Sequence, residues 1–215
     1  MPTSLADPVV IFRDGSLLVV NKPAGLLAVP GRGADKQDCV VARLRPLVPG
    51  MIAQPAVHRL DMATSGLMLV AVTAVAHRQL SRQFETRQVR KRYIALLDGI
   101  VAARQGEIHL PFRLDPDNRP CQIHDPIHGK MGITSWRRLA VEGSRTRVEF
   151  TPVTGRTHQL RVHAAHRLGL GIPIVGDRLY GRGDEGERML LHASFLALSH
   201  PVSGTPLTFA SPAPF

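Results

Sequence analysis

The chain has 215 residues, and its 27 Lys and Arg against 17 Asp and Glu give a formal net charge of +10. The length fits one domain with small elaborations, and a hydrophobic content of 44% is enough for a core. A balance this basic favours a polyanionic partner, most often nucleic acid, although a generally basic enzyme with arginine in place of lysine is the alternative. The longest apolar runs, such as residues 67–72, are too short to cross a membrane.

The N-terminal segment and the cysteines bear on the compartment. Residues 1–10 lack the basic and then apolar regions of a signal peptide. Cys39 and Cys121 have no paired spacing, so no disulfide framework is expected and a reducing compartment fits. We therefore expect a cytoplasmic protein.

The first half of the chain predicts a mixture of strands and helices. Helices are expected at 37–48, ended by Pro49 and Gly50, and at 74–88, where Thr73 can cap the first turn. Short runs of apolar residues bounded by turns predict strands at 9–12, 17–23, 56–60 and 67–73.

The second half is mostly strand. A loop is expected at 111–120, and a helix at 157–169, capped by Thr157 and ended by Gly169. Strands are expected at 89–99, 133–141, 145–153, 189–198 and 206–209, with residues 142–144 forming a hairpin turn. Many strands in succession with few helices favour an α+β fold with a largely antiparallel sheet, and no domain boundary is evident.

The stretch HRLDMATSG places a single carboxylate, Asp61, two residues after Arg59. An ionised aspartate can attack an electrophilic carbon, and a nearby guanidinium keeps it ionised. If the strand at 56–60 continues to Asp61, alternation puts both side chains on one side. An aspartate that merely caps the Thr64-Ser65-Gly66 turn explains the same residues, so the local sequence leaves both readings open.

The stretch TGRTHQLRVH puts His158 and Arg161 three residues apart, on one face of the predicted helix. The backbone donors of a first helical turn suit phosphate or carboxylate, while a surface arginine on a basic helix is the alternative. The histidines at 158, 163 and 166 have no carboxylate or cysteine beside them, so we expect no metal site. In VRKRYIAL, Tyr93 faces away from Arg90 and Arg92, and could stack on a base or be a buried structural residue.

Taken in order, these motifs have a known counterpart. From about residue 9 to 215 the chain resembles the RluA family of pseudouridine synthases, through NKPAGLLAVPG, HRLDMATSGLMLVA, VRKRYIAL, TGRTHQLRVH, GIPIVGDRLYG and MLLHA. HRLDxxTSG is the most specific of these motifs. The length and the loop DPDNRP, followed by Gly129-Lys130, resemble the short branch of the family, which has no S4-type RNA-binding module.

The resemblance implies a fold and a reaction. The fold would be a single pseudouridine synthase catalytic domain over 1–215, with a mixed, mainly antiparallel sheet, a central catalytic cleft, and flanking helices and loops. The isomerase would break the N1–C1′ bond of a uridine in RNA, turn the uracil and join C5 to C1′, with no cofactor or metal. Its substrates would be 23S-type large-subunit rRNA, the tRNA anticodon stem-loop or both, and a monomer is expected.

The resemblance also implies roles for particular residues. Asp61 would be the catalytic nucleophile, whether it attacks C1′ or C6 or assists a glycal route. Arg161 would form a salt bridge with Asp61, and Tyr93 would stack on the base and help to remove the C5 proton. Leu191 would pack near the uracil, and the remaining substrate-binding residues would be His58, Arg59, Arg156 and His158. Arg59 could stack in the gap left by a flipped base or hold a phosphate.

Two segments depart from the family pattern. Residues 163–173 form a longer segment than usual, with Ile172 where a histidine is usual, which bears on RNA choice more than on chemistry. The acidic stretch GDEGER, 183–188, is expected to be a solvated loop.

Two other functions remain as alternatives. One is a non-catalytic RNA-binding protein of ribosome assembly on the same fold; the other is an Asp-dependent glycosidase, for which the second carboxylate is missing.

Overall fold

The computed structural model describes residues 6–215, and the chain divides into two compact units. The first unit runs to Lys91 and includes His192–Pro214, while the second comprises Arg92–Leu191 and Phe215. The prediction about a signal peptide concerns the N-terminal segment, of which residues 1–5 lie outside the described residues. None of the described helices is long and apolar enough to span a bilayer.

The strands of the first unit pair in the order β1–β2–β3–β9, with β10 on β9. All of these pairings are antiparallel except β3 with β9, which run parallel with Ser65 opposite His192. The predicted strands at 9–12, 17–23, 67–73, 189–198 and 206–209 are thereby confirmed. Their bounds are β1 (Val9–Arg13), β2 (Leu17–Lys22), β3 (Ser65–Ala71), β9 (Leu191–Ser199) and β10 (Pro206–Ala210).

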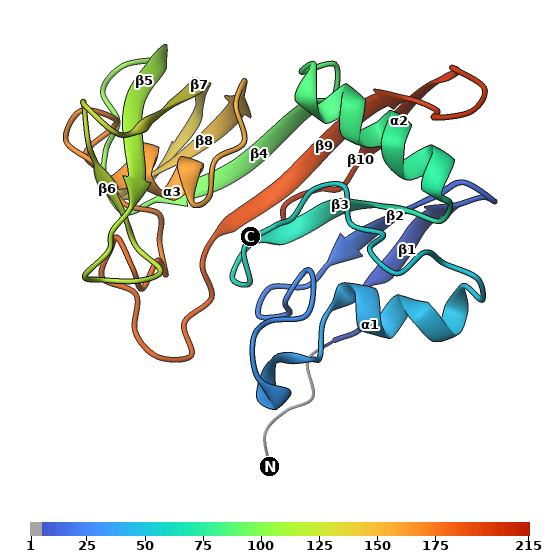
Figure 1. Ribbon diagram of the computed structural model, residues 1–215. Helices are drawn as coiled ribbons and strands as arrows, with labels where there is room; N and C mark the ends of the chain where they lie inside the picture. The colour runs from blue at the N-terminus through green and yellow to red at the C-terminus, as the bar shows by residue number, and fades with distance from the viewer. Residues whose placement is uncertain (1–5) are drawn as a thin grey trace. The chain divides into compact units, whose positions relative to one another are not determined.

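Helix α2 (Ala74–Glu85) covers one face of these strands, and α1 (Val40–Leu44) lies on the other side (Figure 1). The Thr73 hydroxyl accepts a bond from the Ala76 backbone N–H at 3.2 Å, so the predicted cap is confirmed. Ala76 and Leu80 are fully buried and pack against β2, β3 and β9. Burial of a leucine side chain of this kind stabilises the fold by roughly 1.5–3 kcal/mol.

Helix α1 is shorter than the predicted 37–48. Cys39 forms an isolated β-bridge with Leu27, and its Sγ atom accepts a hydrogen bond from the Ala42 N–H. The helix therefore begins only at Val40. Gln37 donates to two glycine carbonyls of the preceding loop instead of joining the helix. A 3₁₀ turn at Arg45–Leu47 follows and contains Pro46.

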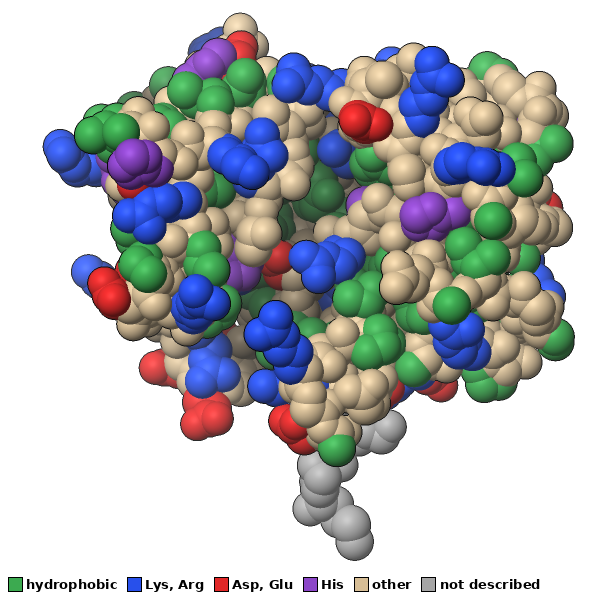
Figure 2. Space-filling model, viewed as in Figure 1, with side chains coloured by type: hydrophobic (Ala, Val, Ile, Leu, Met, Phe, Trp, Pro, Cys, Tyr) green, Lys and Arg blue, Asp and Glu red, His purple; other side chains and the backbone are tan. Residues whose placement is uncertain are grey.

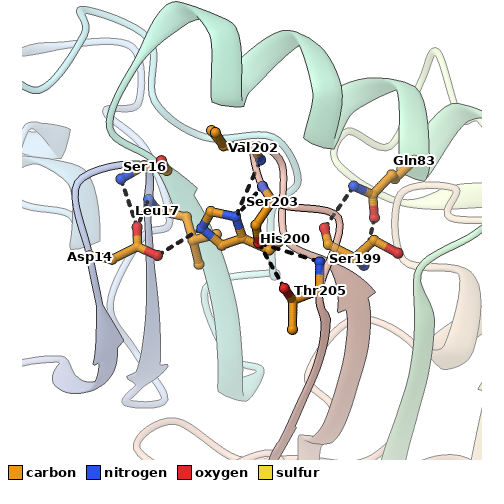
Figure 3. Close-up of polar contacts among 9 residues, drawn as sticks. All are labelled: Asp14, Ser16, Leu17, Gln83, Ser199, His200, Val202, Ser203 and Thr205. Atoms are coloured by element: carbon orange, nitrogen blue, oxygen red, sulfur yellow. Dashed lines mark hydrogen bonds and ion pairs between the residues drawn. The ribbon is translucent and has the colours of Figure 1, made fainter.

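Two side chains fasten the β9–β10 turn to the rest of the first unit (Figure 3). His200 Nε2 lies 2.8 Å from the carboxylate of Asp14, which belongs to the β1–β2 turn. Gln83 of α2 bonds both backbone groups of Ser199, at 2.8 and 3.0 Å. Backbone N–H groups also bond these two side chains: Ser16 and Leu17 donate to Asp14, and Val202 and Ser203 donate to His200.

The strands of the second unit pair in the order β4–β8–β7–β5–β6, all antiparallel. The predicted hairpin across residues 142–144 is confirmed, and Gly143 takes a φ of 62° in its turn. The bounds are β4 (Arg90–Leu97), β5 (Gln105–Leu114), β6 (Gln122–His124), β7 (Lys130–Glu142) and β8 (Arg145–Pro152), with helix α3 at Gln159–Ala165. The predicted α+β class with mainly antiparallel pairing is therefore confirmed.

Other local predictions are also wrong. Residues 56–60 form no strand: Ala56 makes one isolated bridge to Val70, and the His58 ring occupies the Leu69 N–H that a strand partner would need. The loop expected at 111–120 begins only at Asp115, because β5 continues through Pro111. Helix α3 ends at Ala165 instead of Gly169, and its N-cap is His158, not Thr157.

Candidate active site

Asp61 lies in the first unit, in the turn that leads into β3. The turn is closed by a bond from the Thr64 N–H to the Asp61 backbone carbonyl at 3.0 Å, and the Asp61 side chain is half-buried. The predicted strand alternation does not apply here, and Arg59 is exposed. Gly66 has a φ of 112°, and a Cβ there would lie 2.4 Å from the Ala193 carbonyl oxygen. A glycine is thus required where this turn joins β3.

Lys22 holds the Asp61 turn in place. Its side chain is fully buried, and its ammonium donates to the carbonyl oxygens of Pro23, Leu26 and Met62 at 2.9, 2.7 and 3.0 Å. Burial lowers the pKa of Lys22 to about 7, and the nearby Asp61 carboxylate opposes that shift. Because Met62 follows Asp61 directly, these bonds fix the position of the candidate nucleophile.

His58 anchors the same segment to β3. Its Nε2 accepts a bond from the Leu69 N–H at 2.9 Å, and its ring stacks on Phe84 with centroids 4.7 Å apart. Burial, together with the Lys91 ammonium, lowers the pKa of His58 to about 3, so the ring is neutral and Nδ1 carries the proton. These contacts describe a structural anchor, and the predicted substrate-binding role of His58 stays a prediction.

Arg161 lies in the second unit, buried in the first turn of α3. Its Nε and Nη2 atoms donate to Asp177 Oδ2 and Oδ1 at 2.8 and 2.7 Å, a bidentate pair in which both side chains are almost fully buried. Asp177 Oδ1 also accepts from the backbone N–H groups of Leu179 and Tyr180. The Tyr180 ring lies 5.1 Å from the Arg161 Cζ atom, within cation–π range.

His158 joins this group through Tyr180. Its Nδ1 lies 2.8 Å from the Tyr180 hydroxyl, which also accepts a bond from the Gln122 N–H at 2.8 Å. His158 has a left-handed backbone with φ 56° and sits before α3, so it does not share a helix face with Arg161 as the spacing predicted. A non-glycine residue in this conformation costs free energy that its surroundings must offset, which is common at functional sites.

Gln159 ties the segment before α3 to β7. Its Oε1 accepts from the Arg156 N–H at 3.1 Å and from the Thr154 hydroxyl at 2.7 Å. Its Nε2 donates to the Ile133 carbonyl and the Thr134 hydroxyl. These bonds lie before the helix, and the N-cap residue His158 makes no side-chain cap bond, so the cap predicted at Thr157 has no counterpart at the start of α3.

The other predicted residues are spread over both units. Tyr93 is half-buried in β4 opposite Phe150 of β8, and Leu191 is buried at the start of β9. Arg156 is exposed, like Arg59. Of the three histidines considered as ligands, His163 is buried edge-on to Phe112 and His166 lies beside His124. Over residues 6–215, no three His, Cys, Asp or Glu side chains group as metal ligands would.

Sequence reasoning gave no role to three residues that the structure places at these sites: Lys22, Asp177 and Tyr180. Each stands in a motif that was noticed, NKPAG or GIPIVGDRLYG. The available signal was chemical. A lysine that ends an apolar strand and a lone aspartate between apolar and glycine residues are both costly to bury without partners.

The family model described as RNA pseudouridylate synthase matches residues 16–166. The chain belongs to this family. It is 43% identical over 211 residues to the dual-specificity RNA pseudouridine synthase RluA of Escherichia coli O6:H1, covering 96% of this chain and 94% of that protein. The Haemophilus ducreyi protein of the same name is 44% identical over 206 residues, covering 93% of this chain and 90% of that protein.

Solved structures agree. The structure named human RNA pseudouridylate synthase domain containing 1 superposes with a TM-score of 0.80 at 31% identity, covering 100% of this chain and 87% of that one. The similarity to RluA proteins and to this fold shows that the chain is an RNA pseudouridine synthase, an isomerase that acts on RNA, of the short RluA type.

Proposed function

We propose that this synthase isomerises uridines in 23S-type large-subunit rRNA, in the tRNA anticodon stem-loop, or in both. The observation that carries the proposal is near-full-length similarity to proteins named dual-specificity synthases, with identities of 43% and 44%. Sequence-selective recognition of RNA favours loops whose bases can leave the stack, and the target uridine must be flipped to expose C1′ and C6.

Asp61 is the proposed nucleophile. The support is its place on a turn fixed by Lys22 and by the Gly66 junction, since a reacting group must be held within a fraction of an ångström of productive geometry. The N1–C1′ bond breaks, C5 bonds to C1′, the C5 proton leaves to solvent or a base, and N1 takes up a proton from solvent. Attack at C1′, attack at C6 and a glycal route all fit this balance.

Two residues of the second unit complete the proposed catalytic set. Arg161 is proposed to pair with Asp61 and keep it ionised, and its support is the preorganised guanidinium described above. Tyr93 is proposed to stack on the base and to assist removal of the C5 proton. Leu191 is proposed to pack near the uracil.

RNA binding is proposed to involve the exposed arginines Arg59 and Arg156, with His58 and His158 in the same two motifs. Figure 2 shows Lys and Arg side chains spread over the viewed face, consistent with the net charge of +10. Phosphate contacts release counterions, so the affinity for RNA should fall steeply as salt rises. A Kd that does not change with salt would contradict this account.

Three further proposals concern the whole chain. The two units are proposed to act as one catalytic domain, which is supported by relatives that match both of them. The enzyme is proposed to work as a monomer. The cytoplasm is the proposed compartment, which its buried free cysteines, Cys39 and Cys121, support.

The deciding experiment is tritium release. Uridine-labelled large-subunit rRNA and tRNA transcripts carrying tritium at C5 are incubated with the wild-type protein and with Asp61→Asn. Joining C1′ to C5 expels the label, so release from one or both pools that is abolished in the variant supports both the nucleophile and the RNA class. Binding of both RNAs without any release would favour the non-catalytic RNA-binding alternative.

A further inference from the structure

Backbone hydrogen bonds hold Asp177 in a fixed position. Its N–H donates to the Ile174 carbonyl at 3.1 Å, and its own carbonyl accepts from Gly181 and Gly183 at 3.0 and 3.3 Å. Gly176, directly before it, has a φ of 75°, and a Cβ there would lie 2.2 Å from the Arg188 carbonyl oxygen. The GDRLYG sequence therefore forms a closed turn that presents one carboxylate.

That carboxylate and the Tyr180 ring restrict Arg161 in complementary ways. Two parallel hydrogen bonds to one carboxylate fix the plane of a guanidinium as well as its position. The aromatic ring of Tyr180 lies against the same group. The Asp177 oxygens are in turn oriented by the N–H groups of Leu179 and Tyr180, so the acceptor cannot turn away.

We propose that Asp177 and Tyr180 are positioning residues of the isomerisation, which act by holding the Arg161 guanidinium in the orientation it needs to engage Asp61. This inference rests on the role proposed for Arg161 above. Arginine has a long, flexible side chain, and a displacement of about 1 Å in a reacting site can reduce the rate by roughly 10²-fold. Holding Arg161 before the substrate arrives removes that loss.

A purely architectural role makes a different prediction. If the buried pair only joined α3 to the GDRLYG turn, then its loss would lower stability but leave kcat per folded molecule unchanged. A group that acts in the transition state through Arg161 lowers kcat while leaving KM nearly constant. A loss of stability without a loss of kcat therefore indicates an architectural role, and a loss of kcat at constant KM indicates a positioning role.

The test measures kcat and KM by tritium release for wild type, Asp61→Asn, Asp177→Asn and Asp125→Asn, each with its thermal unfolding curve. Asp125→Asn is the matched control, because Asp125 also pairs with an arginine, Arg113, and also accepts backbone N–H bonds, from Ile127 and His128. We expect Asp177→Asn to lower kcat by about 10²-fold with KM changed less than about 3-fold. We expect Asp125→Asn to keep the wild-type kcat.

A double-mutant cycle tests the route through Arg161. Arg161→Lys retains the charge but loses the fork, so Asp177→Asn in that background should slow the reaction by no more than about 3-fold. Full additivity of the two losses would overturn the inference, as would a folded Asp177→Asn enzyme with the wild-type kcat.

Tyr180 variants decide the matter if Asp177→Asn does not fold. Tyr180→Phe keeps the ring over Arg161 but loses the hydroxyl that meets His158, while Tyr180→Leu loses both, so we expect the kcat of Tyr180→Leu to be about 10-fold below that of Tyr180→Phe. Equal kcat values for the two variants would overturn the role of the ring. Wild-type protein without tritium release from any RNA would overturn the proposed function itself, which is a distinct outcome.

Discussion

The Nζ atom of Lys22 lies 3.0 Å from the backbone carbonyl oxygen of Met62, the residue that follows the candidate nucleophile. The same buried ammonium donates to two further carbonyls, those of Pro23 and the buried Leu26, so three backbone acceptors depend on one side chain. An apolar replacement removes all three bonds and leaves the buried Leu26 carbonyl without this donor.

Lys22→Met should therefore lower the free energy of unfolding by roughly 2 kcal/mol, mainly because the buried Leu26 carbonyl loses its partner, and a buried polar group without a partner costs about 1–3 kcal/mol. It should also lower kcat, because the Asp61 turn loses its anchor. Urea unfolding and tritium release measure the two effects. Lys36→Met, at an exposed lysine, is the control, and equal stability of the two variants would contradict the role of Lys22.

Gly66 should tolerate no side chain. In Gly66→Ala the new Cβ would meet the Ala193 backbone at 2.4 Å, where β3 pairs with β9, and the φ of 112° is unfavourable for alanine. We expect a loss of roughly 4 kcal/mol or failure to fold. Gly204→Ala is the matched control: its φ is also positive, at 74°, but a Cβ there has open space, so it should cost only about 1 kcal/mol. Circular dichroism melts of both variants provide the measurement.

The buried imidazole of His163 should make the fold acid-sensitive. Neither ring nitrogen has a hydrogen-bond partner among the described residues, and burial, together with His109, lowers its pKa to about 4. Because the folded-state pKa lies below the ordinary value of about 6.5, the unfolded chain binds the proton more readily. The contribution of the neutral His163 to the free energy of unfolding is therefore complete above pH 6.5 and is lost as the pH falls toward 4.

His163→Leu should remove the part of the acid-dependent fall in the free energy of unfolding that comes from His163. That part is at most about 1.4 kcal/mol per pH unit. His58 keeps a similar loss in the variant, because its pKa is also lowered, so the slope should fall and not vanish. Urea titrations at pH 7, 6 and 5 test this, with the exposed His128→Gln as control. An unchanged slope in His163→Leu would rule out a neutral buried His163.

Arg59 is exposed, so its replacement tests function without disturbing the core. We expect Arg59→Ala to melt like wild type and to lose about 10-fold or more in kcat/KM, which corresponds to about 1.4 kcal/mol of lost transition-state stabilisation. Arg59→Lys discriminates between mechanisms. If a planar group fills the gap in the base stack, then lysine should restore little, whereas a phosphate contact should be largely restored by lysine.

The sequence indicated the strands well where one pattern dominated. Short apolar runs bounded by turns predicted β2 and β3, and Thr73 predicted the capped start of α2. It failed at residues 56–60, where apolar residues resemble a strand but the His58 ring competes for the backbone of Leu69. It also missed most of β5, because Pro111 and the charges that follow interrupt the alternation of buried Ile108, Leu110 and Phe112.

Some residues of the candidate site could likewise be predicted from the sequence, and others could not. Roles for Asp61, Tyr93 and Arg161 were predicted from motifs, because each stands in a stretch that resembles a family motif. Asp177 and Tyr180 were not assigned roles, because their importance depends on which side chain they meet, and Arg161 is 16 residues from Asp177 along the chain. A pairing that is set by tertiary structure leaves no periodic signal in the sequence.

The tie between Asp14 and His200 joins residues 186 positions apart, and Ser65 of β3 meets His192 across 127 positions. During translation, β1, β2 and β3 therefore emerge long before the strand that lies beside β3. The whole second unit, Arg92–Leu191, is synthesised in the interval and can fold first. Until β9 is made, the edge of β3 that pairs with it stays open, so a nascent chain that pauses within the second unit exposes a strand edge, which is a feature that favours aggregation.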